Sequence, residues 1–151
     1  MTQVDFHIGI EDPVAYCCRL VRKVLATGSQ ALIVADAAVL QHLDAALWAD
    51  EPSGFTPHAM ADAPPAVVAR SPVVLAVSVP VDLLPHAVLI NLTSRLPDDS
   101  HTRDRIVELV SDEEDAVKEA RLRWKSYKQL GHELVNHDVR ERAKVRGTDS
   151  G

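Results

Sequence analysis

The chain has 151 residues, of which 46% are hydrophobic and 25% are charged, and its net charge is −6. These values predict one globular domain with a real core and exclude a fibrous or intrinsically disordered chain. The N-terminal segment MTQVDFHIGIEDP lacks the basic start of a secretory signal, and the apolar runs are shorter than the ~20 residues that span a bilayer, so we expect a cytoplasmic protein.

The first third of the chain predicts alternating strands and helices. Residues 3–9 alternate apolar and polar side chains, which is typical of a strand. Asp12 then caps a helix that ends at Gly28. The continuous apolar run 31–35 predicts a strand covered on both faces, and a second helix follows to Trp48.

The remainder predicts more strands and one long helix. After turn chemistry at 51–54, a loop rich in Pro, Ala and Asp is expected up to residue 70. Three strands, a helix and a last strand then follow; their expected ranges are 73–77, 87–91, 105–110, 112–130 and 132–139. Ser111 and Glu114 fit a capping box for that helix, and Gly131 is expected to end it.

This order of elements predicts an α/β fold, a Rossmann-like layered sheet that is mostly parallel and flanked by helices. The domain is expected to span residues 1–139. Residues 140–151 contain almost no apolar side chains and are expected to form a disordered tail. Cys17 and Cys18 are neighbours in a helical pattern and point about 100° apart, so we expect two reduced packing residues.

Charge is unevenly distributed along the chain. Residues 29–100 hold two basic residues against eight acidic ones, whereas Lys118 to Lys128 hold five basic residues against one acidic residue. A local basic strip on an acidic body favours a small acidic ligand over a long duplex.

Signatures of cofactor and metal sites are absent from the sequence pattern. The six glycines are too far apart for a phosphate-binding loop, and the acidic turn around Glu11 and Asp12 would repel phosphate. The histidines lack H-x-x-x-H spacing, so no metal and no cofactor are expected. Asp5 and His7 share one side of a strand, so a small enzyme using this pair stays an alternative, although a half-exposed polar face is the more ordinary interpretation.

The last helix carries two adjacent stripes. Val117, Ala120, Trp124 and Tyr127 form an apolar seam, and the basic stripe lies one residue further on, at Lys118, Arg121, Lys125 and Lys128. Together they offer a place for an apolar side chain beside a carboxylate, which arginine can clamp with two hydrogen bonds. A plain amphipathic helix with a solvated basic face is the alternative. Direct binding of single-stranded nucleic acid is a further one, weakened by an aromatic content of 4%.

A second feature is a pair of aromatic residues, Trp48 and Phe55, on either side of a turn. Aromatic side chains presented in this way are frequent anchors of protein interfaces. The alternative is that both rings close the core at the edge of the sheet.

At these segments the sequence resembles the chi subunit family of DNA polymerase III. The family pattern is matched by Leu43-Asp44-Ala45-Ala46-Leu47-Trp48, by Gly54-Phe55-Thr56-Pro57-His58, and by Ala120-Arg121-Leu122-Arg123-Trp124-Lys125-Ser126-Tyr127 with Gly131 after it. The likeness covers about Met1 to Val139. It implies a Rossmann-like fold without a nucleotide and a non-catalytic accessory subunit.

The resemblance also implies partners and their sites. Such a subunit links the acidic C-terminal tail of single-stranded DNA-binding protein, which ends in Pro-Phe, to the psi subunit and through psi to the clamp loader. By resemblance, Arg121 holds the terminal carboxylate and Trp124 walls the pocket for Phe, with Val110 nearby. Lys118, Lys125 and Lys128 attract the aspartates of the tail. The patch facing psi, or a helicase-like competitor, comprises Trp48, Phe55 and Pro57.

Overall fold

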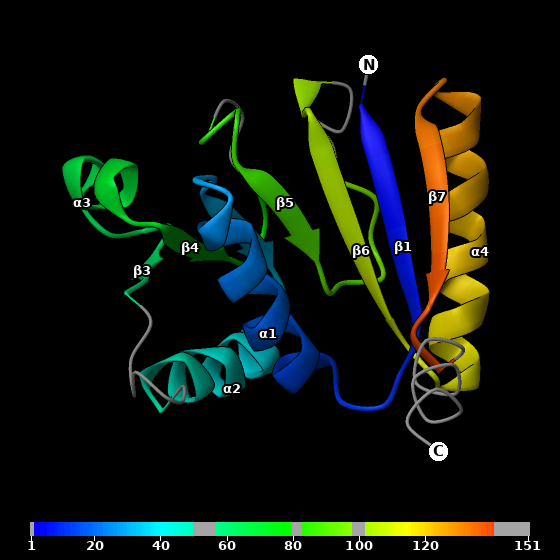
Figure 1. Cartoon of the computed structure of the whole chain (residues 1–151), viewed down its shortest axis with the longest axis horizontal. Helices are drawn as coiled ribbons and strands as arrows, with labels where there is room; N and C mark the ends of the chain where they lie inside the picture. The colour runs from blue at the N-terminus through cyan, green and yellow to red at the C-terminus, as the bar shows by residue number, and fades with distance from the viewer. Residues whose placement is uncertain (1, 50–56, 80–82, 98–101, 141–151) are drawn as a thin grey trace.

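Seven parallel strands form one sheet in the computed structural model of the chain, which describes residues 2–49, 57–79, 83–97 and 102–140 (Figure 1). The strands are β1 (Gln3–Ile10), β2 (Ala31–Val34), β3 (Ala59–Met60), β4 (Val73–Ala76), β5 (Val88–Asn91), β6 (Arg105–Ser111) and β7 (Glu133–Asp138). Their spatial order is β3-β4-β2-β5-β6-β1-β7. The helices are α1 (Pro13–Ala26), α2 (Ala37–Trp48), α3 (Pro65–Arg70) and α4 (Glu114–Gln129). The predicted α/β class with a parallel sheet is confirmed.

The helices cover the two faces of the sheet in separate layers. On one face α1 and α2 bury Cys17, Val21 and Leu43 against sheet residues such as Ile33 and Leu75. On the other face α4 and α3 pack on residues of opposite parity; this second cluster includes Val4, Phe6, Leu32, Val68, Leu89, Ile106, Val110 and Tyr127. The alternation arises because successive side chains of a strand point to opposite faces.

Several local predictions from the sequence are confirmed. Asp12 is the N-cap of α1, and its carboxylate accepts a hydrogen bond from the amide of Ala15 at 3.2 Å. Cys17 and Cys18 are both buried thiols on α1. Burial raises the pKa of Cys17 above its ordinary value, so this thiol stays protonated and is a packing residue.

Two local predictions are wrong. The segment expected to be a loop up to Arg70 contains strand β3 and helix α3. The capping box is also wrong, because Ser111 is the last residue of β6, where it pairs with Ile10, and Glu113 is the N-cap of α4. The strand continues to Ser111 because its pairing with β1 extends that far. The hydroxyl of Ser111 accepts a long hydrogen bond of 3.4 Å from the amide of Glu113.

The predicted tail begins close to the end of the described chain. Arg140 is described, and residues 141–151 of the expected tail lie outside the described residues. No helix in the described ranges is long and apolar enough to cross a membrane.

Candidate functional site

A cavity of about 480 Å³ lies between α4 and the sheet, near the carboxyl ends of β1 and β6. It is lined by residues of four stretches of the chain: Phe6, Ile8, Gly9, Val110, Asp112, Val117, Ala120, Arg121, Trp124, Asn136 and Arg140. The structure therefore brings together Arg121, Trp124 and Val110, three of the residues that the sequence singled out. Lys118, Lys125 and Lys128 do not line it.

Aromatic contacts form one wall of this cavity. The rings of Phe6 and Trp124 meet edge to face, with centroids 5.2 Å apart and an interplanar angle of 60°. Trp124 is only partly buried, whereas Val110 is 2% exposed. Among the described residues, the indole N–H of Trp124 has no hydrogen-bond partner. The wall thus offers an apolar surface for a ring or aliphatic side chain, with one donor at its side.

Two guanidinium groups border the same cavity. Arg121 is exposed, and no described residue forms a hydrogen bond or an ion pair with it. Arg140 is bound to Asp138 through Nε at 3.3 Å and a terminal nitrogen at 3.4 Å. Asp112 is the one acid among the lining residues. The uncommitted guanidinium beside an apolar wall can clamp a carboxylate whose neighbouring side chain enters the cavity.

A buried polar network holds α4 on the sheet beneath this cavity. The Glu108 carboxylate, 0% exposed, accepts hydrogen bonds from Arg123 Nε at 3.1 Å, the Tyr127 hydroxyl at 2.6 Å and the Asn91 amide at 3.0 Å. Arg123 also donates to the Ser94 carbonyl at 3.2 Å. These bonds fix the rotation of α4 and so place Arg121 and Trp124 at the cavity.

Burial dominates the electrostatics of that network. It raises the pKa of Glu108 above its ordinary value, while the Arg123 guanidinium and the donors on Tyr127 and Asn91 lower it in part. Burial and the neighbouring Glu108 also raise the pKa of Tyr127. Tyr127 therefore keeps its proton and remains a donor to the carboxylate.

The basic residues of α4 do not all face solvent. Arg123 is 6% exposed and faces the core, while Lys118, Lys125 and Lys128 are exposed along α4. Lys118 also forms an ion pair of 3.4 Å with Glu114. Exposed cations next to the cavity can attract an acidic ligand through solvent without touching it.

The second predicted patch lies at the other edge of the sheet. Trp48 is 58% exposed, and its ring meets the His58 ring at a centroid distance of 5.8 Å. His58 Nε2 lies 2.6 Å from the Asp44 carboxylate. Pro57 is exposed and lines a shallow cavity with Val67. Trp48 therefore does not close the core; Phe55 lies outside the described residues.

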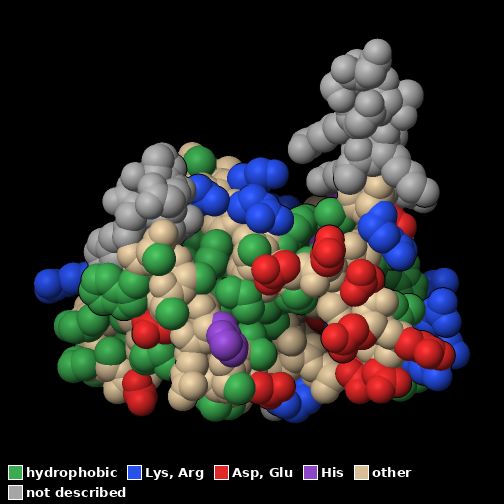
Figure 2. All heavy atoms as spheres, turned by 90° about the horizontal axis from the view of Figure 1, so that it is seen from below, with side chains coloured by type: hydrophobic (Ala, Val, Ile, Leu, Met, Phe, Trp, Pro, Cys, Tyr) green, Lys and Arg blue, Asp and Glu red, His purple; other side chains and the backbone are tan. Residues whose placement is uncertain are grey.

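The carboxyl ends of the parallel strands, where nucleotides bind in Rossmann-like folds, carry negative charge in this chain. Figure 2 views the molecule from the end at which β1 and β7 finish, and acidic side chains gather on this face toward the α4 side. The turns after β1 and β6 supply exposed Glu11, Asp12, Asp112, Glu113 and Glu114. An anionic phosphate would be repelled here.

The structure places three residues at candidate sites that the sequence did not indicate. Arg140 was assigned to the tail, and Gly9 was only a strand residue, yet both line the cavity beside α4. His137 lies opposite His7 across the β1–β7 pairing. The position of each residue depends on which strands are neighbours in the sheet, and no pattern within a single segment of sequence indicates strand order.

Comparison with known proteins gives two findings. The chain matches the family described as DNA polymerase III chi subunit, HolC, over residues 1–135. It is also 34% identical over 142 residues to the protein named DNA polymerase III subunit chi from Pseudomonas aeruginosa, an alignment that covers 91% of this chain and 96% of the relative.

Proposed function

The chain belongs to the DNA polymerase III chi subunit family, and we propose that it captures the acidic C-terminal tail of single-stranded DNA-binding protein in the cavity beside α4. As a member of this family it is an accessory subunit of DNA polymerase III and not itself a catalyst. Its place of action is the bacterial cytoplasm, where replication occurs.

The observation that carries the tail proposal is the pairing of Arg121 with Trp124 at one cavity. A tail that ends in Pro-Phe offers a terminal carboxylate and a phenyl ring on the same residue. The carboxylate fits the uncommitted guanidinium of Arg121, and the ring fits the apolar space beside Trp124 and Val110. The aspartates that precede Pro-Phe would pass the exposed Lys118, Lys125 and Lys128.

The partner on the clamp-loader side is assigned to the opposite edge. Trp48 is exposed and its ring contacts the His58 ring, and Pro57 and His58 line the second, shallow cavity. Phe55 lies between Trp48 and Pro57 in the sequence. An aromatic anchor that is 58% exposed is typical of an interface residue. We assign this patch to psi or to a helicase-like competitor, through which the subunit reaches the clamp loader.

A peptide titration tests the tail site. A fluorescent peptide ending in Asp-Asp-Ile-Pro-Phe should bind in the micromolar range, about −8 kcal/mol. Replacing its terminal carboxylate by a carboxamide should weaken binding by about 10- to 100-fold, because a charge-assisted hydrogen bond is lost. Arg121→Glu should abolish binding.

Lys128→Glu is the matched control, because it makes the same charge change two turns further along α4, at a residue that does not line the cavity. It should weaken binding only a few-fold. Equal binding of the acid and carboxamide peptides, or wild-type affinity in Arg121→Glu, would show that the tail does not dock through its carboxylate at this site.

A further inference from the structure

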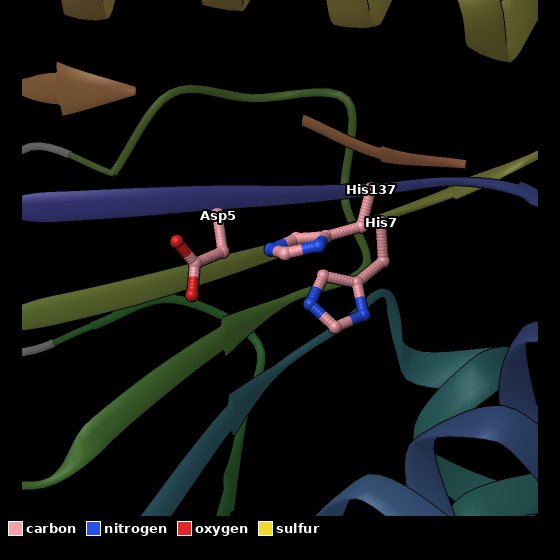
Figure 3. A group of neighbouring side chains, drawn as sticks. All are labelled: Asp5, His7 and His137. Atoms are coloured by element: carbon pink, nitrogen blue, oxygen red, sulfur yellow. The ribbon is translucent and has the colours of Figure 1, made fainter. Parts of the chain in front are cut away.

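Three potential metal ligands lie together on the face of the sheet opposite the cavity beside α4, which is called the tail cavity from here on. Asp5 and His7 lie on β1, and His137 lies on β7 directly opposite His7 in the strand pairing. One ligand atom from each residue lies within 4.8 Å of the others. Figure 3 shows the His137 ring extending toward the Asp5 carboxylate, with the His7 ring on the same side of β1.

The spacing is close to what one metal ion requires. Metal–nitrogen and metal–oxygen bonds of Zn²⁺ sites are about 2.0–2.2 Å, so neighbouring ligand atoms in a tetrahedral site lie roughly 3.3–3.6 Å apart. The three side chains, whose ligand atoms lie within 4.8 Å of one another, therefore need to close by up to about 1.5 Å. His7 and His137 rings already have centroids 4.9 Å apart.

Outer hydrogen bonds fix two of the three ligands. Nδ1 of His7 is hydrogen-bonded to the Tyr16 hydroxyl, and in the tautomer that donates its N–H to that oxygen the lone pair of the ring lies on Nε2. Asp5 is 2% exposed; its two oxygens accept hydrogen bonds from Gln3 at 2.9 Å and from Arg105 at 3.0 Å. Metal sites commonly use such outer partners to orient imidazole and carboxylate ligands.

A solvent cavity provides access to this cluster. It has a volume of about 620 Å³ and is lined by His7, His137 and Tyr16, together with the cationic Arg19, Lys23 and Arg105. Arg105 is paired with Asp5 at 3.0 Å, while Arg19 and Lys23 are exposed. Cations that line the same cavity disfavour binding of a bare dication, but they favour binding of an anion at the coordination position that the protein leaves open.

We infer that Asp5, His7 and His137 form a binding site for a divalent transition-metal ion of the Zn²⁺ and Co²⁺ class. Two imidazoles and one carboxylate supply three ligands, and the open position faces the cavity and takes water or a small anion. The site would tie the edge strand β7 to β1 from the face that α4 does not cover.

Co²⁺ absorption in the visible range tests the site directly. Wild-type protein, stripped with a chelator and titrated with Co²⁺ alone, should develop the bands of a nitrogen- and oxygen-bound ion at one equivalent, and Zn²⁺ should displace them. Zn²⁺ should also raise Tm, because an ion that binds only the folded state stabilises it. His137→Ala should lose more than about 100-fold in affinity, and Tyr16→Phe, which keeps the ligands, about 10- to 100-fold.

His86→Ala is the matched control, because His86 has a side chain that is 89% exposed and lies outside the cluster. It should bind Co²⁺ like the wild type. The inference is overturned if wild-type protein gives no bands at one equivalent, or if His137→Ala binds Co²⁺ as tightly as the wild type, which would mean adventitious binding to surface histidines. Folding of each variant is checked by circular dichroism.

Discussion

Two arginines that are two residues apart on α4 have opposite environments. Arg123 is 6% exposed and binds the fully buried Glu108, whereas Arg121 faces the cavity and has no partner among the described residues. Removing one member of a buried ion pair leaves the other charge without compensation in a medium of low dielectric constant. Removing an exposed side chain without contacts leaves the folded state almost unchanged.

This contrast predicts opposite effects of two alanine substitutions. Arg123→Ala should lower the free energy of unfolding by about 3–5 kcal/mol, because Glu108 stays buried without its cation. Arg121→Ala should change it by less than about 0.5 kcal/mol and yet weaken binding of the tail peptide. Urea unfolding of both variants measures the free energy of unfolding. Similar stability losses in the two variants would show that Arg123 is not the structural arginine.

The sequence already contained part of this distinction. The basic stripe of the helix follows a spacing of three and four residues, and Arg123 lies off that spacing, on the side of Ala120 and Tyr127. Glu108 within an apolar strand indicates a buried acid that requires a partner. That its partner is Arg123 depends on how α4 packs on β6, which local sequence patterns do not report.

At the scale of elements, local sequence patterns predict the longer strands and helices but not which strands are neighbours in the sheet. The buried strands and the long helix follow from continuous apolar runs and from 3.6-residue periodicity, and most were predicted within a few residues. Strand β3 has two residues and α3 has six, too short for any period to emerge. Arg140 and His137 reach their sites only because β7 pairs with β1.

Gly9 illustrates how one position of β1 shapes the tail cavity. Its φ of +73° is a left-handed conformation, it lies within an irregularity of the β1–β6 pairing, and an added Cβ would lie 2.5 Å from Nε of Arg140. Gly9→Ala should therefore cost about 1–3 kcal/mol of stability through backbone strain and should also displace Arg140. Binding of the tail peptide should weaken because the cavity wall moves.

Gly28→Ala is the control that separates the effect of backbone strain from the effect of displacing Arg140. Gly28 has a φ of +84°, and nothing lies within 4 Å of an added Cβ. It should lose a similar amount of stability in urea unfolding and keep wild-type affinity for the tail peptide. If Gly9→Ala also binds the peptide like the wild type, Arg140 and Gly9 do not shape the bound state.

At the scale of the whole molecule, the two proposed interfaces lie at opposite edges of one sheet. Figure 1 shows β7 and β3 at the two edges of the sheet. Residues of β1, β6, α4 and β7 line the tail cavity, and the ring of Trp48 contacts His58, which directly precedes β3. The five strands between these edges carry most of the buried core. A partner at one edge therefore does not block the other.

This separation predicts that two partners bind at once and independently. Trp48→Ala should disrupt co-elution with psi and leave the affinity for the tail peptide unchanged, because the two surfaces share no residues. Calorimetric titration of the peptide into the variant measures this. A loss of peptide affinity beyond about twofold would mean that the two edges are coupled.

Charge distribution predicts how salt acts on tail binding. The protein carries a net charge of −6, so an acidic tail is repelled by the molecule as a whole and attracted only by the strip along α4. Screening lengths fall from about 8 Å at 0.15 M salt to about 3 Å at 1 M, so the exposed lysines lose their influence first. The carboxylate clamped by Arg121 is in direct contact and is screened less.

A variant with Lys118, Lys125 and Lys128 all changed to Gln should bind the peptide more weakly at low salt and show a flatter salt dependence than the wild type, with the two affinities converging near 1 M. Fluorescence anisotropy at several salt concentrations measures both slopes, and parallel slopes would place the attraction elsewhere on the molecule.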